Sequence, residues 1–111
     1  MKILNPEEVA NAIPYVDMSV PPSRFDKRSI ARRELVLMFD VSDRAIRKAI
    51  EEARKMGYFI INDQNGAGYY RTDDLDTIER QYRQDTSRAM AILARRKAMR
   101  KFLRENGRMV K

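Results

Sequence analysis

Two apolar-periodic segments, separated by only two residues, constrain this chain more than any other feature of its sequence. The first predicts a helix over residues 32–39 and the second a helix over residues 42–56. Only Asp40 and Val41 lie between them, so the two helices must meet around a tight turn. The residues that the first helix is expected to bury are Leu35, Leu37 or Met38, and Phe39.

The second helix has clear start and stop signals. The Ser42 hydroxyl can accept a hydrogen bond from a free backbone N–H of the first turn, Asp43 places negative charge at the positive end of the helix dipole, and Gly57 can close the helix. At about 100° per residue the helix has one face to pack and an opposite face that is free to meet a partner. The packing face holds Ile46, Ala49, Ile50 and Ala53, and the opposite face holds Arg44, Lys48, Glu51 and Lys55.

A candidate β-hairpin follows this helix pair. Residues 58–61 and 69–71 are short β-favouring runs, and the seven residues 62–68 between them are rich in turn formers. The backbone of Gly66 and Gly68 can approach a phosphate, although a simple hairpin turn explains both glycines equally well. The aromatic residues of these strands are expected to pack in the core, with base stacking as the alternative. They are Tyr58, Phe59, Tyr69 and Tyr70.

The spacing of the helix pair resembles the twenty-residue helix-turn-helix pattern. With Arg32 as its first position, Val36 falls where the pattern has a small residue, Asp40 where it has Gly, and Ile46 where it has Val or Ile. Val36 is bulkier than the usual Ala at the helix crossing, and Asp40 tolerates positive φ better than most residues. Ala31 stands where a Ser or Thr cap usually opens the first helix.

The order helix, Gly, strand, Gly-containing turn and Gly-Tyr-Tyr strand resembles the winged helices of the biotin-repressor type. It is also similar to small phage and prophage winged-helix proteins, in which a basic C-terminal helix follows the domain. The resemblance implies a fold that is mainly α with a small β-hairpin wing: a winged helix-turn-helix plus a long basic C-terminal helix. It implies a double-stranded DNA-binding protein in transcriptional regulation or replication-origin recognition, whose second helix reads the major groove.

The rest of the chain divides around this motif. Residues 6–13 predict a short helix with Asn5 as its N-cap, ended by Pro14, and residues 17–28 read as an extended connector. The early helix either docks as the first helix of the core or leaves a core that another chain completes. Residues 74–104 predict a long helix capped by Thr72 or Asp73. The expected divisions are therefore 1–28, 29–72, 73–106 and a tail of 107–111.

The long helix carries an imperfect apolar stripe. Its members recur at three- and four-residue steps, with interruptions around Asp85 and Arg96, and indicate a helix that packs at its start and can pair with a second copy farther along. A homodimer through the C-terminal helix is one partner that the sequence allows. The stripe consists of Leu75, Ile78, Tyr82, Ala89, Ile92 or Leu93, Met99 and Leu103.

Composition excludes several kinds of chemistry. The 111 residues include no Cys and no His, which rules out disulfides, zinc fingers, Cys nucleophiles and His acid–base catalysis. The acidic residues Asp73, Asp74 and Asp76 are better explained as N-terminal helix charges than as Mg²⁺ ligands. We therefore expect no enzyme activity, no metal and no cofactor. No apolar run reaches about 20 residues and no signal-peptide core is visible, so we expect no membrane contact and a cytoplasmic location.

The net charge of +7 and a pI near 10 indicate a polyanionic partner. The excess is concentrated at the end, where residues 72–111 carry eleven basic against six acidic residues. From Arg88 onward nine basic residues face a single acid, Glu105. A charged face of this kind can hold phosphates or serve only as a solvated surface.

Base contacts are expected from Arg44, Arg47 and Lys48 in the first two turns of the second helix. The full set of predicted DNA-binding residues is Ser42, Arg44, Arg47, Lys48, Lys55, Arg71, Arg95, Arg96 and Arg100. The alternative is a solvated face with internal ion pairs, namely Glu51–Lys55, Arg47–Glu51 and Lys48–Glu52. A second function class is a protein-interaction module that docks a replication, recombination or transcription protein. Its basis is a wing tip without basic residues, together with Glu51 and Glu52.

Overall fold

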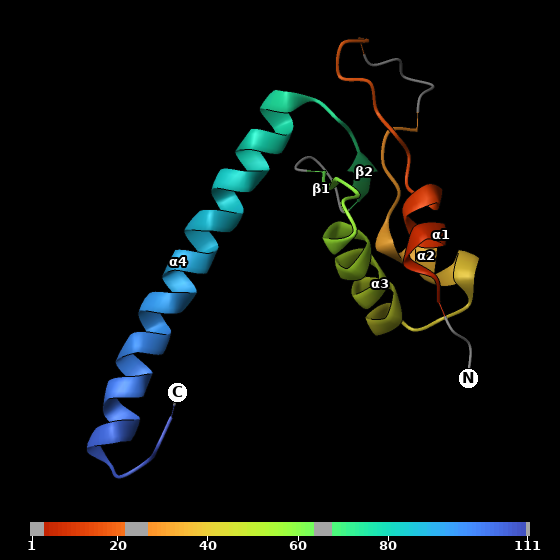
Figure 1. The fold of residues 1–111 in the computed structure, drawn as a ribbon. Helices are drawn as coiled ribbons and strands as arrows, with labels where there is room; N and C mark the ends of the chain where they lie inside the picture. The colour runs from red at the N-terminus through yellow and green to blue at the C-terminus, as the bar shows by residue number, and fades with distance from the viewer. Residues whose placement is uncertain (1–3, 22–26, 64–67, 111) are drawn as a thin grey trace. The chain divides into compact units, whose positions relative to one another are not determined.

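The computed structural model describes residues 4–21, 27–63 and 68–110. The fold is mainly helical with one small two-stranded antiparallel sheet, as the sequence predicts at this level (Figure 1). The chain divides into two units, one ending at Ile78 and one beginning at Glu79, which are described separately. In chain order the elements are α1 (Pro6–Ala12), α2 (Arg32–Phe39), α3 (Asp43–Lys55), β1 (Ile60–Asn62), β2 (Tyr69–Arg71) and α4 (Leu75–Glu105).

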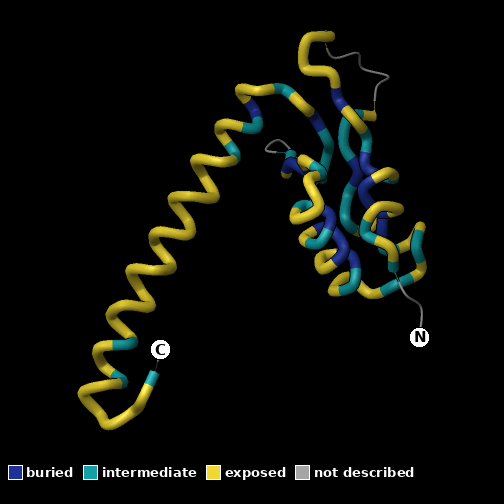
Figure 2. The backbone as a smooth tube through the Cα atoms, viewed as in Figure 1, coloured by how far each residue is buried: buried dark blue, intermediate teal, exposed yellow. Residues whose placement is uncertain are grey.

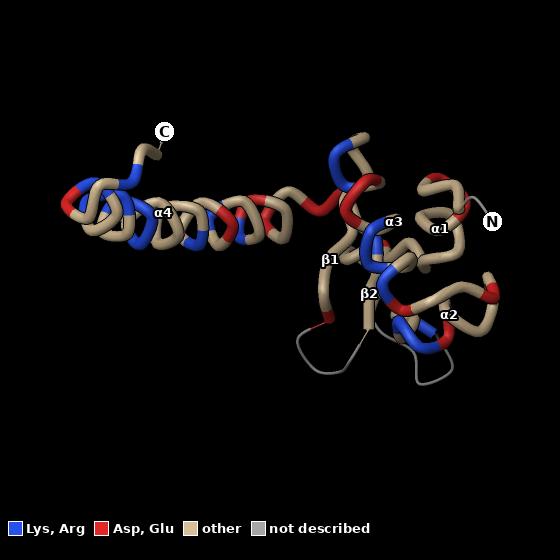
Figure 3. Tube along the Cα trace, turned by 90° about the horizontal axis from the view of Figure 1, so that it is seen from below, with Lys and Arg blue, Asp and Glu red and all other residues tan. Residues whose placement is uncertain are grey.

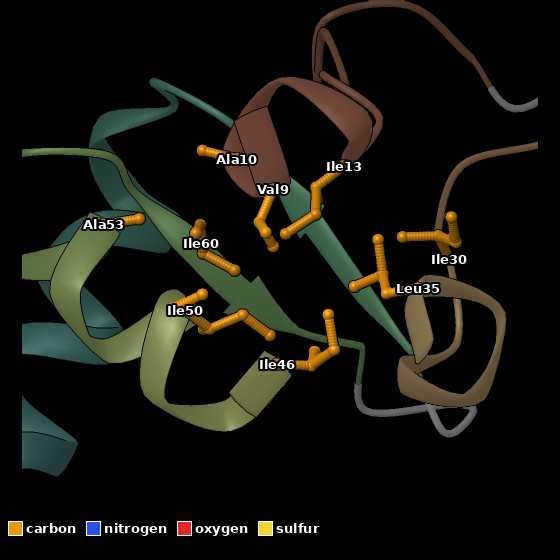
Figure 4. Close-up of a cluster of buried hydrophobic side chains, with 10 residues drawn as sticks. Val9, Ala10, Ile13, Ile30, Leu35, Ile46, Ile50, Ala53 and Ile60 are labelled. Atoms are coloured by element: carbon orange, nitrogen blue, oxygen red, sulfur yellow. The ribbon is translucent and has the colours of Figure 1, made fainter. Parts of the chain in front are cut away.

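The core of the first unit lies where α1 and α2 pack on α3. Figure 4 shows side chains from all three helices converging, together with Ile30 and Ile60. The early helix therefore completes this core from within the chain, which rules out the alternative of a core left open for another chain. Figure 2 shows the same concentration of buried positions along α1, α3 and β1. The core side chains are Val9, Ala10, Ile13, Ile30, Leu35, Ile46, Ala49, Ile50, Ala53 and Ile60.

Helix α1 forms for the reasons expected from its sequence. The Asn5 side-chain oxygen accepts a hydrogen bond from the Glu7 amide at 2.9 Å, and Pro6 occupies the first turn, where its missing N–H costs nothing. The helix ends at Ala12, one residue before the predicted end, because Ile13 is already extended and Pro14 follows. Val9, Ala10 and Ile13 are buried, which places α1 against α3.

The α2–turn–α3 segment agrees closely with the prediction. Asp40 has φ of +52° and ψ of +53°, the left-handed conformation that the helix-turn-helix spacing requires at this position. The Ser42 hydroxyl accepts a hydrogen bond from the Ala45 amide at 3.1 Å, and Ala31 makes no side-chain cap. Gly57, with φ of +100°, follows the end of α3.

The predicted buried face of α2 was too wide. Leu35 is fully buried and Phe39 packs at the edge of the core, but Leu37 and Met38 are 73% and 59% exposed. Phe39 is four residues from Leu35 and shares its face, whereas Leu37 points about 200° away from Leu35 on a helix of only two turns. The prediction that Leu37 or Met38 is buried is therefore wrong.

The hairpin begins two residues later than predicted. Ile60, Ile61 and Asn62 of β1 pair with Arg71, Tyr70 and Tyr69 of β2. The amide of Tyr58 still bonds to the carbonyl of Ala53 at 3.1 Å, so Tyr58 closes the end of α3 instead of starting the strand. Tyr58 and Tyr69 pack against the core, as predicted, but Phe59 is 50% exposed and does not. Gln64 to Ala67 of the predicted loop lie outside the described residues.

Strand β2 also has hydrogen-bonded neighbours on its other side, which the sequence did not reveal. Ile30 exchanges two backbone hydrogen bonds with Tyr69, at 2.9 and 3.0 Å. Arg71 donates from its amide to the Pro14 carbonyl at 2.7 Å and accepts from the Val16 amide at 2.8 Å. Both Val16 and Ile30 are buried. The segment predicted as a loose connector is therefore fixed to the sheet at both of its ends.

Helix α4 is capped by a residue different from the two expected. Asp74 accepts hydrogen bonds from the Thr77 amide at 3.0 Å and the Thr77 hydroxyl at 2.6 Å, so the prediction of Thr72 or Asp73 as cap is wrong. Thr72 instead accepts from the Asp74 amide at 3.2 Å, and Asp73 accepts from the Tyr15 hydroxyl. That hydrogen bond, more than the partial desolvation of Tyr15, raises the Tyr15 pKa. Within the described part of the chain, no helix combines the length and the apolar character needed to cross a membrane.

Candidate nucleic-acid interface

Helix α3 presents a basic face opposite its core face. Ile46, Ala49, Ile50 and Ala53 are buried, which fixes the rotation of the helix about its axis. Arg44, Arg47 and Lys48 in the first half of the helix are exposed, as is Lys55 near its end. Figure 3 shows these basic positions along α3, with further basic and acidic positions at the start of α2. The rotation predicted from the sequence is confirmed.

Ion pairs reduce the free charge on this face, but not through the pairs expected from the sequence. Arg47 pairs with Asp43 at 3.0 Å, one turn earlier. Glu51 pairs with Arg54 at 2.7 Å, and Glu52 pairs with Lys55 at 3.4 Å. Exposed pairs of this kind contribute little to stability, about 0–1 kcal/mol, so a phosphate can displace them.

Two cations of α3 remain outside this network. Arg44 and Lys48, one turn apart on the same face, have neither an ion pair nor a hydrogen bond to any other described residue. Arg47 stands beside them and is 61% exposed at its side chain, although it shares Asp43. The strongest free positive charge of α3 therefore lies in its first two turns, while both glutamates lie in its second half.

Arg32 links the starts of the two motif helices to the hairpin. Its Nε donates to Asp43 Oδ1 at 2.6 Å, and its Nη1 donates to the Tyr69 hydroxyl at 3.3 Å. The Tyr69 hydrogen bond and then that of Asp43 raise the Arg32 pKa, so Arg32 stays charged. Asp43 therefore pairs with two arginines, Arg32 and Arg47, and Arg32 connects the starts of α2 and α3 to Tyr69 of β2.

A hollow lies beside this junction. It is bordered by the start of α2, the start of α3, and the ends of β1 and β2 that are nearest the hairpin loop. Arg33 is exposed at its edge, close to the basic half of α3 in the fold. The sequence analysis did not include Arg32 or Arg33 among the predicted DNA-binding residues. The lining residues are Ala31, Arg32, Arg33, Asp43, Asn62, Asp63, Gly68 and Tyr69.

The remaining predicted residues divide into three groups. Ser42 uses its hydroxyl oxygen as the α3 cap. Arg71 has a structural role, since its Nε donates to the Ile13 carbonyl at 2.9 Å and its side chain is partly buried, so it is poorly placed to leave for a phosphate. Arg95 and Arg96 are exposed on α4 and Arg100 is partly exposed, all in the second unit.

Gly68 is explained by packing. A Cβ atom at this position would lie 3.0 Å from the Ser29 hydroxyl oxygen and 3.2 Å from the Ile30 carbonyl oxygen. The absent side chain lets the segment before α2 approach β2. Gly66 lies outside the described residues, so neither explanation given for it, a phosphate contact or a hairpin turn, is tested.

The described residues contain no group of three or more carboxylates that could hold a metal ion. Comparisons with protein-family models, curated proteins and solved structures found no match for this chain.

Proposed function

We propose that this chain is a double-stranded DNA-binding protein of the winged helix-turn-helix class, with α3 as its recognition helix. The observation that carries the proposal is the pair Arg44 and Lys48, two exposed cations without internal partners in the first two turns of α3. An Arg in this part of a recognition helix can hold guanine O6 and N7 with its planar fork, and a Lys can reach a base or a phosphate.

The arrangement of elements supports this proposal. Helices α2 and α3 meet around a three-residue turn with positive φ at Asp40, α1 packs on α3, and a hairpin follows. This order is consistent with the winged-helix resemblance of the sequence, and the basic side chains in the first two turns of α3 are exposed. Fold-level likeness alone is an analogy, so the proposal depends on the charged face.

Phosphate contacts would hold the helix in the groove. Arg33 and Arg47 flank the free pair, and Arg95 and Arg100 of the basic C-terminal helix offer further contacts to the backbone. We place the protein in the cytoplasm and assign it to transcriptional regulation or origin recognition of the phage or prophage kind. We assign it no catalytic role and no cofactor.

Site selection from a random duplex DNA pool tests the proposal, followed by binding measurements on the selected duplex. Arg44→Ala and Lys48→Ala should each lower affinity about tenfold, since one good base or phosphate contact contributes about 1–3 kcal/mol. Arg44→Lys keeps the charge but loses the bidentate fork, so it should reduce discrimination between sequences more than it reduces binding to unrelated DNA.

Arg83→Ala is the matched control. It removes the same charge from an exposed, ion-paired arginine of α4, whose side chain is 76% exposed. Affinity should stay within about twofold, because the charge of Arg83 is already paired with Glu79 at 2.7 Å. Equal losses of DNA affinity in Arg83→Ala and Arg44→Ala would mean that the effect comes from net charge alone. A selection that enriches no sequence would refute base readout.

Docking to a protein of replication, recombination or transcription is the second candidate function. The exposed Leu37 and Met38 on α2 favour it, because two large apolar side chains side by side are a common feature of protein interfaces. Sequence-selective DNA binding that is retained in the Leu37→Ser variant would separate this docking role from DNA recognition.

A further inference from the structure

One face of helix α4 is apolar and lacks a partner within the second unit. Its residues recur at alternating steps of four and three, the spacing of a helix that packs along another helix. Three of its large apolar members are well exposed, Tyr82 at 71%, Ile92 at 47% and Met99 at 56%. Ile78, the last residue of the first unit, and Leu103 are partly buried. The stripe consists of Ile78, Tyr82, Asp85, Ala89, Ile92, Arg96, Met99 and Leu103.

The two charged members of the stripe are arranged symmetrically. Asp85 lies seven residues after Ile78, the first member, and Arg96 lies seven residues before Leu103, the last. Both interrupt the apolar face, and they have opposite charge. A copy of the helix running in the reverse direction therefore brings each acid opposite a base.

We propose that this face binds a second copy of the chain in an antiparallel helix pair. In this register the midpoint falls between Met90 and Ala91, and each layer joins residues whose numbers add to 181. The eight layers consist of four distinct pairs that each occur twice, and each pairs one a position with one d position, as in antiparallel coiled coils. The layers are Ile78 with Leu103, Tyr82 with Met99, Asp85 with Arg96, and Ala89 with Ile92.

The charges of Asp85 and Arg96 favour this arrangement over a parallel one. Asp85 accepts a hydrogen bond from Gln81 at 2.9 Å, which leaves carboxylate lone pairs for a further donor. Arg96 has no ion pair or hydrogen bond with any other residue that the structure describes. A parallel pair in register would place Asp85 against Asp85 and Arg96 against Arg96, two like-charge layers in its centre. The antiparallel pair replaces them with two opposite-charge layers.

The two sides of the helix pair differ in their charge interactions. On one side Glu79 comes beside Arg100 of the second copy, an attractive pair. On the other side Arg88 comes beside Arg95 of the second copy, so positive charge accumulates there. Repulsion along that side should weaken the dimer at low salt and be screened as ionic strength rises. The pairing does not depend on DNA binding, and it assigns Arg96 to the dimer in place of a phosphate contact.

Sedimentation equilibrium of the full chain with exchanged charges tests the register. At about 150 mM salt, Asp85→Arg and Arg96→Asp should each raise the dimer Kd about tenfold or more, because each creates two like-charge layers. The double variant D85R/R96D restores opposite charges and should return the Kd to near the wild-type value. Lys97→Asp is the control: it reverses a neighbouring charge off the stripe and should leave the Kd nearly unchanged.

Introduced cysteines test the direction independently, since the chain has no cysteine of its own. A mixture of Tyr82→Cys and Met99→Cys chains should form disulfide-linked heterodimers on mild oxidation, while either variant alone should not. Circular dichroism confirms that each variant keeps its helix content. Cross-linking of Tyr82→Cys with itself, failure of the double charge variant to recover, or a wild-type chain that stays monomeric up to about 1 mM would overturn the proposal.

Discussion

Asp40 shows how one residue sets the geometry of the α2–α3 turn. Its backbone occupies the left-handed region at φ of +52°, which costs a residue with a Cβ atom about 1–2 kcal/mol and costs Gly almost nothing. Its amide bonds back to the Val36 carbonyl, so the strain is held in place by the end of α2. The helix-turn-helix spacing identified this position correctly from the sequence.

Asp40→Gly should therefore stabilise the protein, and Asp40→Ala should destabilise it. The expected changes in unfolding free energy are about 0.5–1 kcal/mol in each direction, since Ala lacks the short polar side chain that makes Asp tolerable here. Urea denaturation followed by circular dichroism measures both. A Gly variant less stable than the wild-type chain would show that the Asp40 side chain makes a contact more valuable than the relief of strain.

Individual residues were predictable where the cause is local. The caps by Asn5 and Ser42 and the buried face of α3 follow from residue type and helical spacing alone. The ion pairs of α3 did not follow the prediction because Asp43–Arg47 has the favoured acid-before-base order at four residues, and Arg54 competes for Glu51. The role of Arg32 required the fold, since its partners lie 11 and 37 residues away.

Strand β2 has hydrogen-bonded neighbours on both of its sides. Its three residues pair with β1 on one side, and Tyr69 and Arg71 bond to Ile30, Pro14 and Val16 on the other. The sequence predicted the hairpin but not these flanking segments, because contacts of one or two residues leave no periodic pattern. For the same reason residues 17–28 were predicted only as an extended connector, without the hydrogen bonds of Val16 and Ile30 that flank it.

Gly68→Ala should separate the segment before α2 from the hairpin. The added methyl group would lie 3.2 Å from the Ile30 carbonyl oxygen, a backbone atom that cannot rotate away. We expect a loss of about 1–3 kcal/mol of stability, typical of overpacking. Gly57→Ala is a useful comparison, because a Cβ there meets nothing within 4 Å and the cost is only that of positive φ. A larger loss for Gly57→Ala than for Gly68→Ala in thermal denaturation would contradict this account of Gly68.

At the scale of the whole molecule, the net charge of +7 is unevenly distributed. In the first unit much of the charge on α3 is balanced by ion pairs, whereas most basic residues of α4 after Arg88 have few acids near them in sequence. Composition indicates a polyanionic partner, which stays a prediction, and it does not identify which cations are free. The first unit ends at Ile78, within the first residues of α4, and the second unit begins at Glu79.

The two proposals together make a prediction about the DNA target. An antiparallel helix pair has a twofold axis, so a dimer presents two recognition helices related by that axis. Sites selected by the wild-type chain should be inverted repeats, and those selected by Asp85→Arg should be single half-sites bound more weakly. Sequencing of both selected pools checks this. Single sites from the wild-type chain would mean that the two proposals do not operate together.

The position of β2 also determines when the domain can fold during synthesis. Pro14 and Val16, which follow α1, and Ile30, which precedes α2, leave the ribosome early, yet their hydrogen-bonding partners are at Tyr69 and Arg71. Until that strand emerges, α1, α2 and α3 can form helices but cannot close the sheet that joins them. A nascent chain released before residue 71 would therefore expose most of its core residues without the strand that ties them together.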